Sequence, residues 1–229
     1  MLENIIGILV SFAYFFGLLF LSIFIQKKNA ELARKFVHIM LGNWWFILLK
    51  FFDSMIFALI VPASFIFINF FSMKKSGNVL SNLEQERKEK SYGIVLYPIS
   101  LVLLIVISYA LLKNPFAGGI GVMALAYGDG FAALVGNKLK FKPFCVFRNT
   151  KTVSGSLAMF FATFISILIY HVILSRFYFP NTLIVILAIS IITTLVEAIT
   201  PYGLDNLTIP VLAIFTYFVL MKLNIKILF

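Results

Sequence analysis

Residues 5–35 read IIGILVSFAYFFGLLFLSIFIQKKNAELARK, an unbroken apolar run followed at once by a basic segment. With a rise of about 1.5 Å per residue, the run from Ile5 to Ile25 can cross a hydrocarbon core of roughly 30 Å as a helix. Glu3 precedes this run, with no basic residue before it, and no small-residue cleavage site follows. We therefore expect an uncleaved membrane helix and not a signal peptide.

The rest of the chain repeats this alternation of apolar and basic segments. The composition is 62% hydrophobic and only 12% charged, with 27 Phe, which is far from that of a soluble protein. Fourteen of the 19 Lys and Arg fall in three polar segments. By the positive-inside rule these segments face the cytoplasm. They contain Lys27, Lys28, Arg34 and Lys35; Lys74, Lys75, Arg87, Lys88 and Lys90; and Lys138, Lys140, Lys142, Arg148 and Lys151.

These patterns predict an all-α polytopic membrane protein, with residues 1–229 forming a single domain of about eight transmembrane helices. Both termini would then be extracytoplasmic. Within the polar loop from Lys74 to Ser91, the stretch Asn82–Lys90 is expected to form a short surface helix. The expected membrane helices are Asn4–Ile25, Phe36–Lys50, Ser54–Met73, Tyr92–Leu112, Phe116–Gly136, Val153–Ile173, Thr182–Ile199 and Leu207–Met221.

Charge and cysteine content exclude several functional classes. The net charge of +10 is explained by membrane topology and lipid headgroups, so nucleic-acid binding is not expected. The single cysteine, Cys145, cannot form an internal disulfide. No Cys/His cluster has the spacing of a metal site.

Asp129 is a carboxylate inside an apolar run, in the sequence AYGDGFAALVGNK. A charge at that depth costs about 2.5–3.5 kcal/mol on insertion scales, so a partner must satisfy it. Gly128 and Gly130 flank it and allow a ligand or another backbone to come close, and Gly136 lies on the same helical face. The interpretation is a functional carboxylate. The alternative is a structural carboxylate paired with Lys or Arg.

Lys151 lies in RNTKTVSGS, residues 148–156, directly before a long apolar helix. Hydroxyl side chains here can cap that helix, and its first N–H groups would form an anion site beside Lys151 and Arg148. The pattern favours phosphate binding. An ordinary capped helix with a positive-inside lysine remains the alternative.

Two further groups of ionisable residues fall at the expected cytoplasmic ends of helices. Glu197 and Asp205 bracket a loop without a basic residue, so they need a divalent cation or bases from other loops; Asp205 could instead be a simple turn or cap residue. Arg34, Lys35 and His38 are spaced to face one cleft and favour phosphate contact, although an interfacial His is often structural.

Taken in order, these pieces resemble the CTP-dependent polyprenol kinase family, which includes dolichol, phytol and farnesol kinases and a diacylglycerol kinase. The resemblance spans the chain from Arg34 to its C-terminus and is nearest to the phytol kinase branch. Many members have Glu where this chain has Ser154, which argues against a eukaryotic dolichol kinase. The residues that carry the resemblance are Arg34-Lys35-Phe-Val-His38, Tyr127-Gly128-Asp129-Gly130 with Gly136, Asn149-Thr-Lys151-Thr-Val-Ser-Gly155-Ser156, and Glu197 with Asp205-Asn206-Leu-Thr-Ile-Pro210.

The resemblance implies transfer of the γ-phosphate of a nucleotide, CTP, to the primary hydroxyl of an isoprenoid alcohol in a prokaryotic cytoplasmic membrane. Asp129, Lys151, Glu197 and Asp205 would be catalytic, and Mg²⁺ would be held by Asp129, Glu197 and Asp205. The active site would lie at the cytoplasmic face. The residues expected to bind nucleotide or phosphate are Arg34, Lys35, His38, Gly128, Gly130, Gly136, Lys138, Arg148, Asn149, Thr152, Gly155, Ser156 and Asn206.

Three other functions are the alternatives. A CTP-dependent diacylglycerol kinase differs only in its acceptor, and a membrane cytidylyltransferase would attack the α-phosphate and release pyrophosphate. A transporter would instead place acidic residues along a path near the membrane midplane. The crowding of ionisable residues near the basic loops disfavours the transporter.

Overall fold

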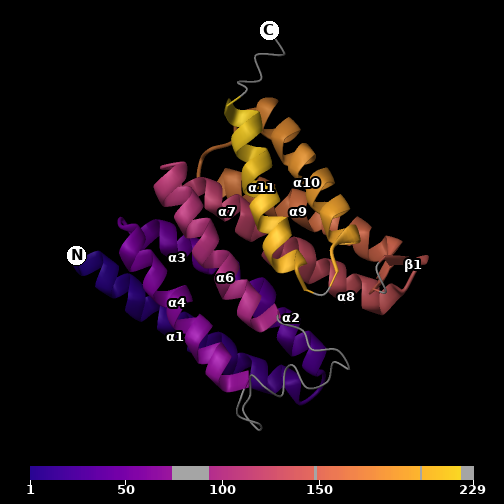
Figure 1. Ribbon diagram of the computed structural model, residues 1–229, viewed down its shortest axis with the longest axis horizontal. Coiled ribbons are helices and arrows are strands. Elements are labelled where there is room, and N and C mark those ends of the chain that lie inside the picture. Colours follow the sequence, from indigo (N-terminus) through magenta and orange to yellow (C-terminus); the bar gives the residue numbers. More distant parts are fainter. Residues whose placement is uncertain (74–92, 147–148, 202, 223–229) are drawn as a thin grey trace.

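The structure, a computed structural model, describes residues 1–73, 93–146, 149–201 and 203–222 (Figure 1). The described chain is helical apart from one hairpin of two strands. The predicted surface helix at Asn82–Lys90 lies outside the described residues. The elements are α1 (Leu2–Gln26), α2 (Ala30–Leu41), α3 (Trp44–Phe51), α4 (Met55–Met73), α6 (Gly93–Ile105), the π-helical turn η1 (Val106–Leu111), α7 (Pro115–Met123), the π-helical turn η2 (Ala124–Asp129), α8 (Gly130–Leu139), β1 (Pro143–Val146), β2 (Asn149–Thr152), α9 (Val153–Ile173), α10 (Asn181–Ile199) and α11 (Asp205–Lys222).

Five helical segments of the described chain are long and apolar enough to cross a membrane. They are Leu2–Gln26, Pro115–Leu139, Val153–Ile173, Asn181–Ile199 and Asp205–Lys222, and shorter apolar helices cover Met55–Phe71 and Val95–Leu111. These lengths and compositions confirm an all-α integral membrane protein. The number of crossings and the side of each terminus remain predictions.

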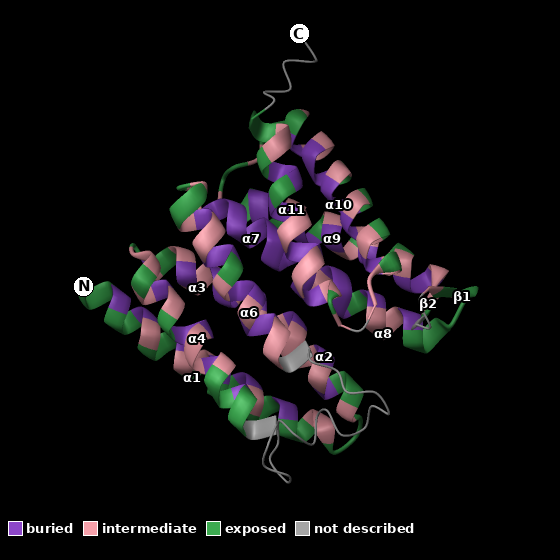
Figure 2. Cartoon of the chain, in the orientation of Figure 1, coloured by how far each residue is buried: buried purple, intermediate pink, exposed green. Residues whose placement is uncertain are grey.

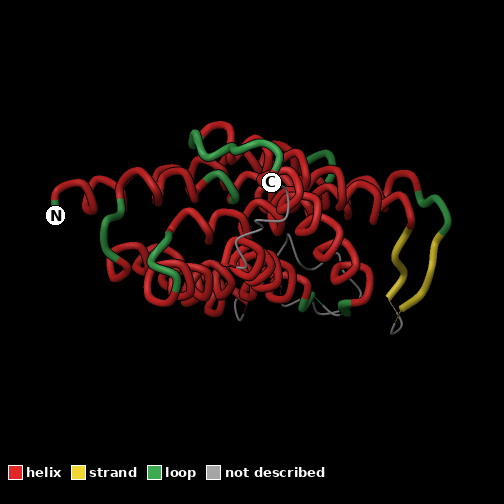
Figure 3. Tube along the Cα trace, turned by 90° about the horizontal axis from the view of Figure 1, so that it is seen from above, coloured by secondary structure: helices red, strands yellow, loops and turns green. Residues whose placement is uncertain are grey.

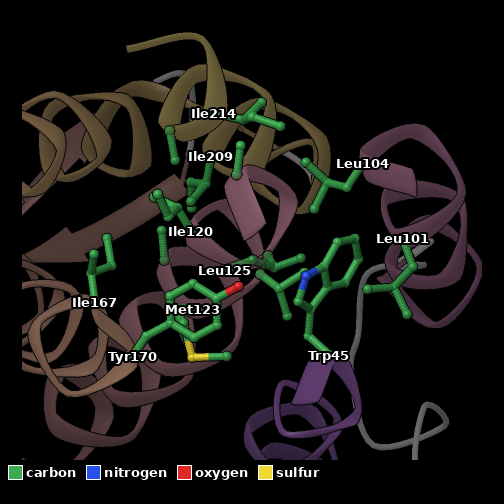
Figure 4. Packing of buried hydrophobic residues seen from close by; sticks show 14 of the residues in the cluster. Trp45, Leu101, Leu104, Ile120, Met123, Leu125, Ile167, Tyr170, Ile209 and Ile214 are labelled. Carbon is green, nitrogen blue, oxygen red and sulfur yellow. The ribbon is translucent and has the colours of Figure 1, made fainter. Parts of the chain in front are cut away.

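The segment Pro115–Leu139, built from α7, η2 and α8, is the central helix of the bundle. In its most apolar stretch 72% of the residues are buried, whereas the corresponding share in α1 is 22%. Exposed residues run along α1 (Figure 2), and several of them are large and apolar. Glycines permit this burial because other helices pack directly on them. A Cβ at Gly119 would lie 2.1 Å from the Tyr170 hydroxyl, and a Cβ at Gly118 would lie 2.3 Å from the Trp45 ring. Trp45 and Tyr170 lie beside Ile120 and Met123 in the core (Figure 4).

The predicted single helix Phe36–Lys50 is wrong. The structure divides this region into α2, which starts earlier at Ala30, and α3, with a turn at Gly42 and Asn43. Hydrogen bonds of the i→i+3 type run through the turn, from Gly42 N to Ile39 O at 3.1 Å and from Trp45 N to Gly42 O at 3.2 Å. The turn brings Gly42 against η2, where a Cβ on Gly42 would lie 2.5 Å from the Ala126 Cβ. Close packing on the central helix therefore accounts for the break.

The hairpin β1–β2 connects α8 to α9 at the end of the molecule far from the N-terminus (Figure 3). The strands are antiparallel, with Phe144 opposite Lys151 and Pro143 opposite Thr152. The Val153 N–H also donates to the Lys142 carbonyl oxygen at 3.2 Å. The hairpin thus fixes Lys151 immediately beside the first turn of α9.

Candidate active site

One group of functional side chains joins α2 to η2. Lys35 Nζ lies 2.7 Å from Asp129 Oδ2, and His38 Nε2 lies 3.2 Å from the same oxygen. Both ion-pair partners are deeply buried, since the side chains of Lys35 and Asp129 are 7% and 10% exposed. We call these three residues the Lys35 cluster. Asp129 is therefore a buried carboxylate paired with a lysine, which is the geometry of the structural alternative that the sequence left open.

The π-helical turn η2 adds backbone acceptors to this cluster. His38 Nε2 lies 3.2 Å from the Leu125 carbonyl oxygen, and Lys35 Nζ lies 3.4 Å from that of Asp129. A π-turn disturbs the regular i→i−4 ladder and is frequent at functional sites. The apolar run Phe116–Gly136 predicted a regular helix here and gave no sign of the π-helical turn.

The flanking glycines serve helix packing in this structure. A Cβ on Gly128 would lie 2.3 Å from Thr163 Oγ1 on α9, and a Cβ on Gly130 would lie 2.3 Å from Ile39 Cγ1 on α2. Protein side chains therefore occupy the space that each missing Cβ leaves. Their predicted contact with nucleotide stays a prediction.

A second group joins β2 to the facing ends of α10 and α11. Lys151 Nζ forms a short ion pair with Glu197 Oε1 and lies 3.7 Å from Asp205 Oδ2. We call these three residues the Lys151 cluster. Burial lowers the pKa of Lys151, but attraction to Glu197 and Asp205 outweighs it and raises the pKa above its ordinary value. The amine is therefore protonated at neutral pH.

The charges of the two clusters interact with one another. Asp129 is attracted by Lys151 and repelled by Asp205, and Asp205 is attracted by Lys35. The element that carries Asp129, η2, contacts each of α9, α10 and α11. Four patches that are distant in the sequence therefore converge at one end of the bundle.

Glycines let α8 and α9 meet closely at this end. A Cβ on Gly136 would lie 3.4 Å from the Gly155 Cα, and a Cβ on Gly155 would lie 3.0 Å from the Ala132 carbonyl oxygen. Thr152 caps α9 as the sequence predicted, because its Oγ1 accepts a hydrogen bond from Gly155 N at 3.0 Å. Since Gly155 and Val153 already donate their N–H groups, the helix start keeps fewer donors for a phosphate than we expected.

Two predicted residues carry polar oxygens that are buried without a hydrogen-bond partner among the described residues. They are Oδ1 of Asn206 and Oγ of Ser156. The Asn206 amide nitrogen donates to the Gly203 carbonyl oxygen at 3.1 Å, which orients the side chain beside Asp205. An unpaired buried acceptor of this kind costs about 1–3 kcal/mol, which a ligand or cation can offset.

The other predicted binding residues lie around this end with different surroundings. Arg34 NH2 lies 3.8 Å from Glu31 Oε1 on the same face of α2. Lys138 is exposed in the last turn of α8. Asn149 pairs with Val146 in the hairpin, and its side chain lies outside the described part of the chain, as does Arg148.

Tyr97 on α6 is a further residue beside the Lys35 cluster, and it was not among the predicted site residues. Its ring packs edge-on against His38, with ring centroids 4.8 Å apart, and only 4% of the residue is exposed. The Tyr97 hydroxyl is buried with no partner among the described residues. A tyrosine in an apolar helix gives no distinguishing signal, so only the fold could reveal it.

The donor groups of the site show whether it suits a divalent cation. The described residues hold no group of three or more His, Cys, Asp and Glu side chains arranged around one metal position. They do provide hard oxygen donors: the carboxylates of Asp129, Glu197 and Asp205, and the unpaired Oδ1 of Asn206. Magnesium in nucleotide sites needs only one or two carboxylates, because phosphates and water complete its shell. The donor set fits magnesium that arrives with a nucleotide.

Comparison with known proteins agrees with the ordered motifs. No family model matches the chain, and no solved structure matches it. The chain is similar to a phytol kinase from Synechocystis sp., with 29% identity over 194 residues, which cover 81% of this chain and 78% of the relative. This similarity confirms the resemblance to the polyprenol kinase family, on its phytol kinase side, that the residues from Arg34 onward indicate.

Proposed function

We propose that this protein is a membrane kinase that transfers the γ-phosphate of CTP to the primary hydroxyl of an isoprenoid alcohol of the phytol, geranylgeraniol or polyprenol type. The observation that carries the proposal is the convergence of the Lys35 and Lys151 clusters at one end of the bundle. Its likeness to a protein named phytol kinase supports the choice of acceptor, and the resemblance to the family supports CTP.

The residues present suit phosphoryl transfer because that reaction depends on alignment and on neutralising phosphate charge. Lys151 and Lys35 now neutralise carboxylates at the two clusters. When a triphosphate binds, the Lys151 ammonium group would exchange its carboxylates for phosphate oxygens, while Lys35 would stay paired with Asp129. Glu197 and Asp205 would then be free to hold magnesium.

Magnesium would be held by Asp129, Glu197 and Asp205, directly or through water, and Asn206 Oδ1 adds an acceptor beside Asp205. When bound, the ion supplies charge neutralisation on the phosphates. The alcohol oxygen attacks the γ-phosphorus, the bond from that phosphorus to the bridging oxygen breaks, and the nucleoside diphosphate leaves with the bond's electrons. The hydroxyl proton passes to a carboxylate of the site.

The membrane supplies the acceptor. Exposed apolar side chains cover the outer faces of the helices, so an isoprenoid chain dissolved in lipid can reach the site laterally. The basic residues Lys138, Lys140 and Lys142 lie at the same end of the bundle as Lys151. By the positive-inside rule this end would face the cytoplasm, where CTP is found.

The decisive experiment incubates purified protein with labelled CTP and a panel of acceptors: phytol, farnesol, geranylgeraniol, a long polyprenol and diacylglycerol. A kinase moves γ-label into lipid and leaves α-label in the nucleotide. Transfer of α-label with release of pyrophosphate would identify a cytidylyltransferase instead. Transfer to diacylglycerol alone would replace the acceptor, and ion movement in liposomes without nucleotide binding would support a transporter.

A further inference from the structure

A polar pocket lies at the opposite end of the bundle from the candidate active site. It has a volume of about 410 Å³ and is lined where α9 ends and α10 begins, with side chains from α11. The helix α9 separates the two sites, since Lys151 precedes its first residue and His171 lies in its last turn. At about 1.5 Å per residue, its 21 residues span roughly 31 Å, the thickness of a hydrocarbon core. The pocket therefore belongs to the other membrane interface.

The lining of the pocket favours an anion. Arg176 contributes a guanidinium, Ser175, Thr182 and Tyr217 contribute hydroxyls, and the lining contains no Asp or Glu. Within the described residues, no carboxylate lies within ion-pair distance of Arg176. A cationic group with several hydroxyl donors and no competing acid is suited to phosphate oxygens.

The guanidinium of Arg176 is held in position before any ligand binds. Its carbon lies 4.9 Å from the centroid of the buried Phe116 ring, a cation–π contact. The backbone supports the same residue, because Arg176 N donates to the His171 carbonyl oxygen at 2.8 Å. Stacking on a ring leaves the in-plane N–H groups available to an oxyanion.

The surroundings point to a lipid as the source of that phosphate. Tyr178 and Phe179 are 70% and 75% exposed beside the pocket, as expected of aromatic residues at a membrane interface. Val172 and Ile173, 57% and 59% exposed on the end of α9, present apolar surface to acyl chains directly below. A headgroup at this depth would carry its chains along that surface.

We propose that the pocket around Arg176 binds the phosphate of a phospholipid headgroup in the leaflet opposite the active site. The site requires neither nucleotide nor acceptor alcohol and is independent of the kinase proposal. It would anchor the α9–α10 connection to the membrane.

The test measures thermal unfolding of the purified protein in detergent with dihexanoyl phosphatidic acid, with dihexanoylglycerol and with inorganic phosphate. The phosphatidic acid should raise the unfolding temperature, whereas dihexanoylglycerol should have little effect. An equal rise with dihexanoylglycerol would show an apolar effect and overturn the proposal. An equal rise with inorganic phosphate at the same concentration would overturn the assignment to a lipid.

Arg176→Gln should weaken the apparent affinity for phosphatidic acid by at least about tenfold, because a charge-assisted contact is lost. Lys113→Gln is the matched control, since Lys113 is an exposed base at the same end, next to α7, and should leave the affinity unchanged. Arg176→Lys keeps the positive charge but loses the planar guanidinium that lies over Phe116. If Arg176→Gln does not fold, this variant should show an intermediate loss of affinity for phosphatidic acid. Unchanged binding by the Arg176 variants would reject the site.

Discussion

The Lys35 cluster and the Lys151 cluster contain basic and acidic side chains in opposite proportions. In the first, an ammonium and an imidazole converge on the single carboxylate of Asp129. In the second, one ammonium faces the two carboxylates of Glu197 and Asp205. The Lys151 cluster therefore carries an excess of acid that a cation can satisfy, while the carboxylate of the Lys35 cluster is already well supplied with partners.

The two clusters also differ in how firmly the surrounding elements hold them. The Lys35 cluster lies between two helices, and the side chains of its ion pair are 7% and 10% exposed. Lys151 lies on a two-stranded hairpin with 19% of its side chain exposed, opposite helix ends. We infer that the Lys35 cluster fixes the geometry of the site, and that the Lys151 cluster exchanges partners when a nucleotide binds.

The largest effect is expected from Asp129→Asn. Removing the buried charge leaves Lys35 without its counterion, which costs about 3–5 kcal/mol of stability. Loss of a carboxylate that positions the reacting groups should also lower kcat by roughly 10³-fold. Transfer of γ-label to phytol and the unfolding temperature in detergent measure the two effects separately.

The double variant Lys35→Gln with Asp129→Asn separates folding from chemistry. It replaces the buried ion pair with neutral amides and should recover much of the stability lost in the single variant. Catalysis should not recover with it. Activity of Asp129→Asn within tenfold of the unmodified protein would contradict the assignment of Asp129 to the reaction.

Lys151→Met should have the next largest effect, with a roughly 10²-fold loss of kcat/KM for the nucleotide. Two carboxylates would then face each other without an ammonium between them, so nucleotide binding should fall even when the acceptor is absent. Lys140→Met removes the same charge from the exposed residue that follows α8 and serves as control. Equal losses in both variants would indicate a general effect of surface charge and would refute a specific role for Lys151.

The sequence could predict most of the helices because long apolar runs separate basic segments, and it could predict the capping of α9 because Thr152 directly precedes that run. It also selected Lys35, Asp129, Lys151 and Glu197, since ionisable side chains near apolar helices need partners. Which basic residue pairs with Asp129 could not be predicted from the sequence. Asp129 is 94 residues from Lys35, and only the packing of α2 on η2 brings them together.

The remaining differences also arise from tertiary packing. The break between α2 and α3 follows from the close approach of Gly42 to Ala126, which no local pattern indicates. The π-helical turn η2 lies inside a long apolar run that also suits a regular helix, so its backbone acceptors for His38 and Lys35 could not be foreseen.

A smaller effect should show whether the Lys151 cluster helps to hold magnesium. Asp205→Asn removes part of the excess negative charge in the Lys151 cluster, so half-maximal activity should need about tenfold more magnesium. Glu31→Gln removes one charge from a side chain that is 44% exposed and should leave the magnesium dependence unchanged. An unchanged magnesium dependence of Asp205→Asn, with activity lost at every concentration, would contradict a role in holding the ion.

The smallest effect concerns the rigidity of the Lys35 cluster and uses two tyrosines as a matched pair. The Tyr97 hydroxyl is buried without a partner among the described residues, whereas the Tyr127 hydroxyl donates to Asn43 Oδ1 at 2.7 Å. Tyr97→Phe should therefore stabilise the protein slightly, by up to about 1 kcal/mol, and Tyr127→Phe should destabilise it by about the same amount. Unfolding temperatures of the two variants in the same detergent give the comparison. A clear loss of stability in Tyr97→Phe would mean that its hydroxyl has a bound partner at the cluster, and the Lys35 cluster would then be an open ligand site, not a fixed support.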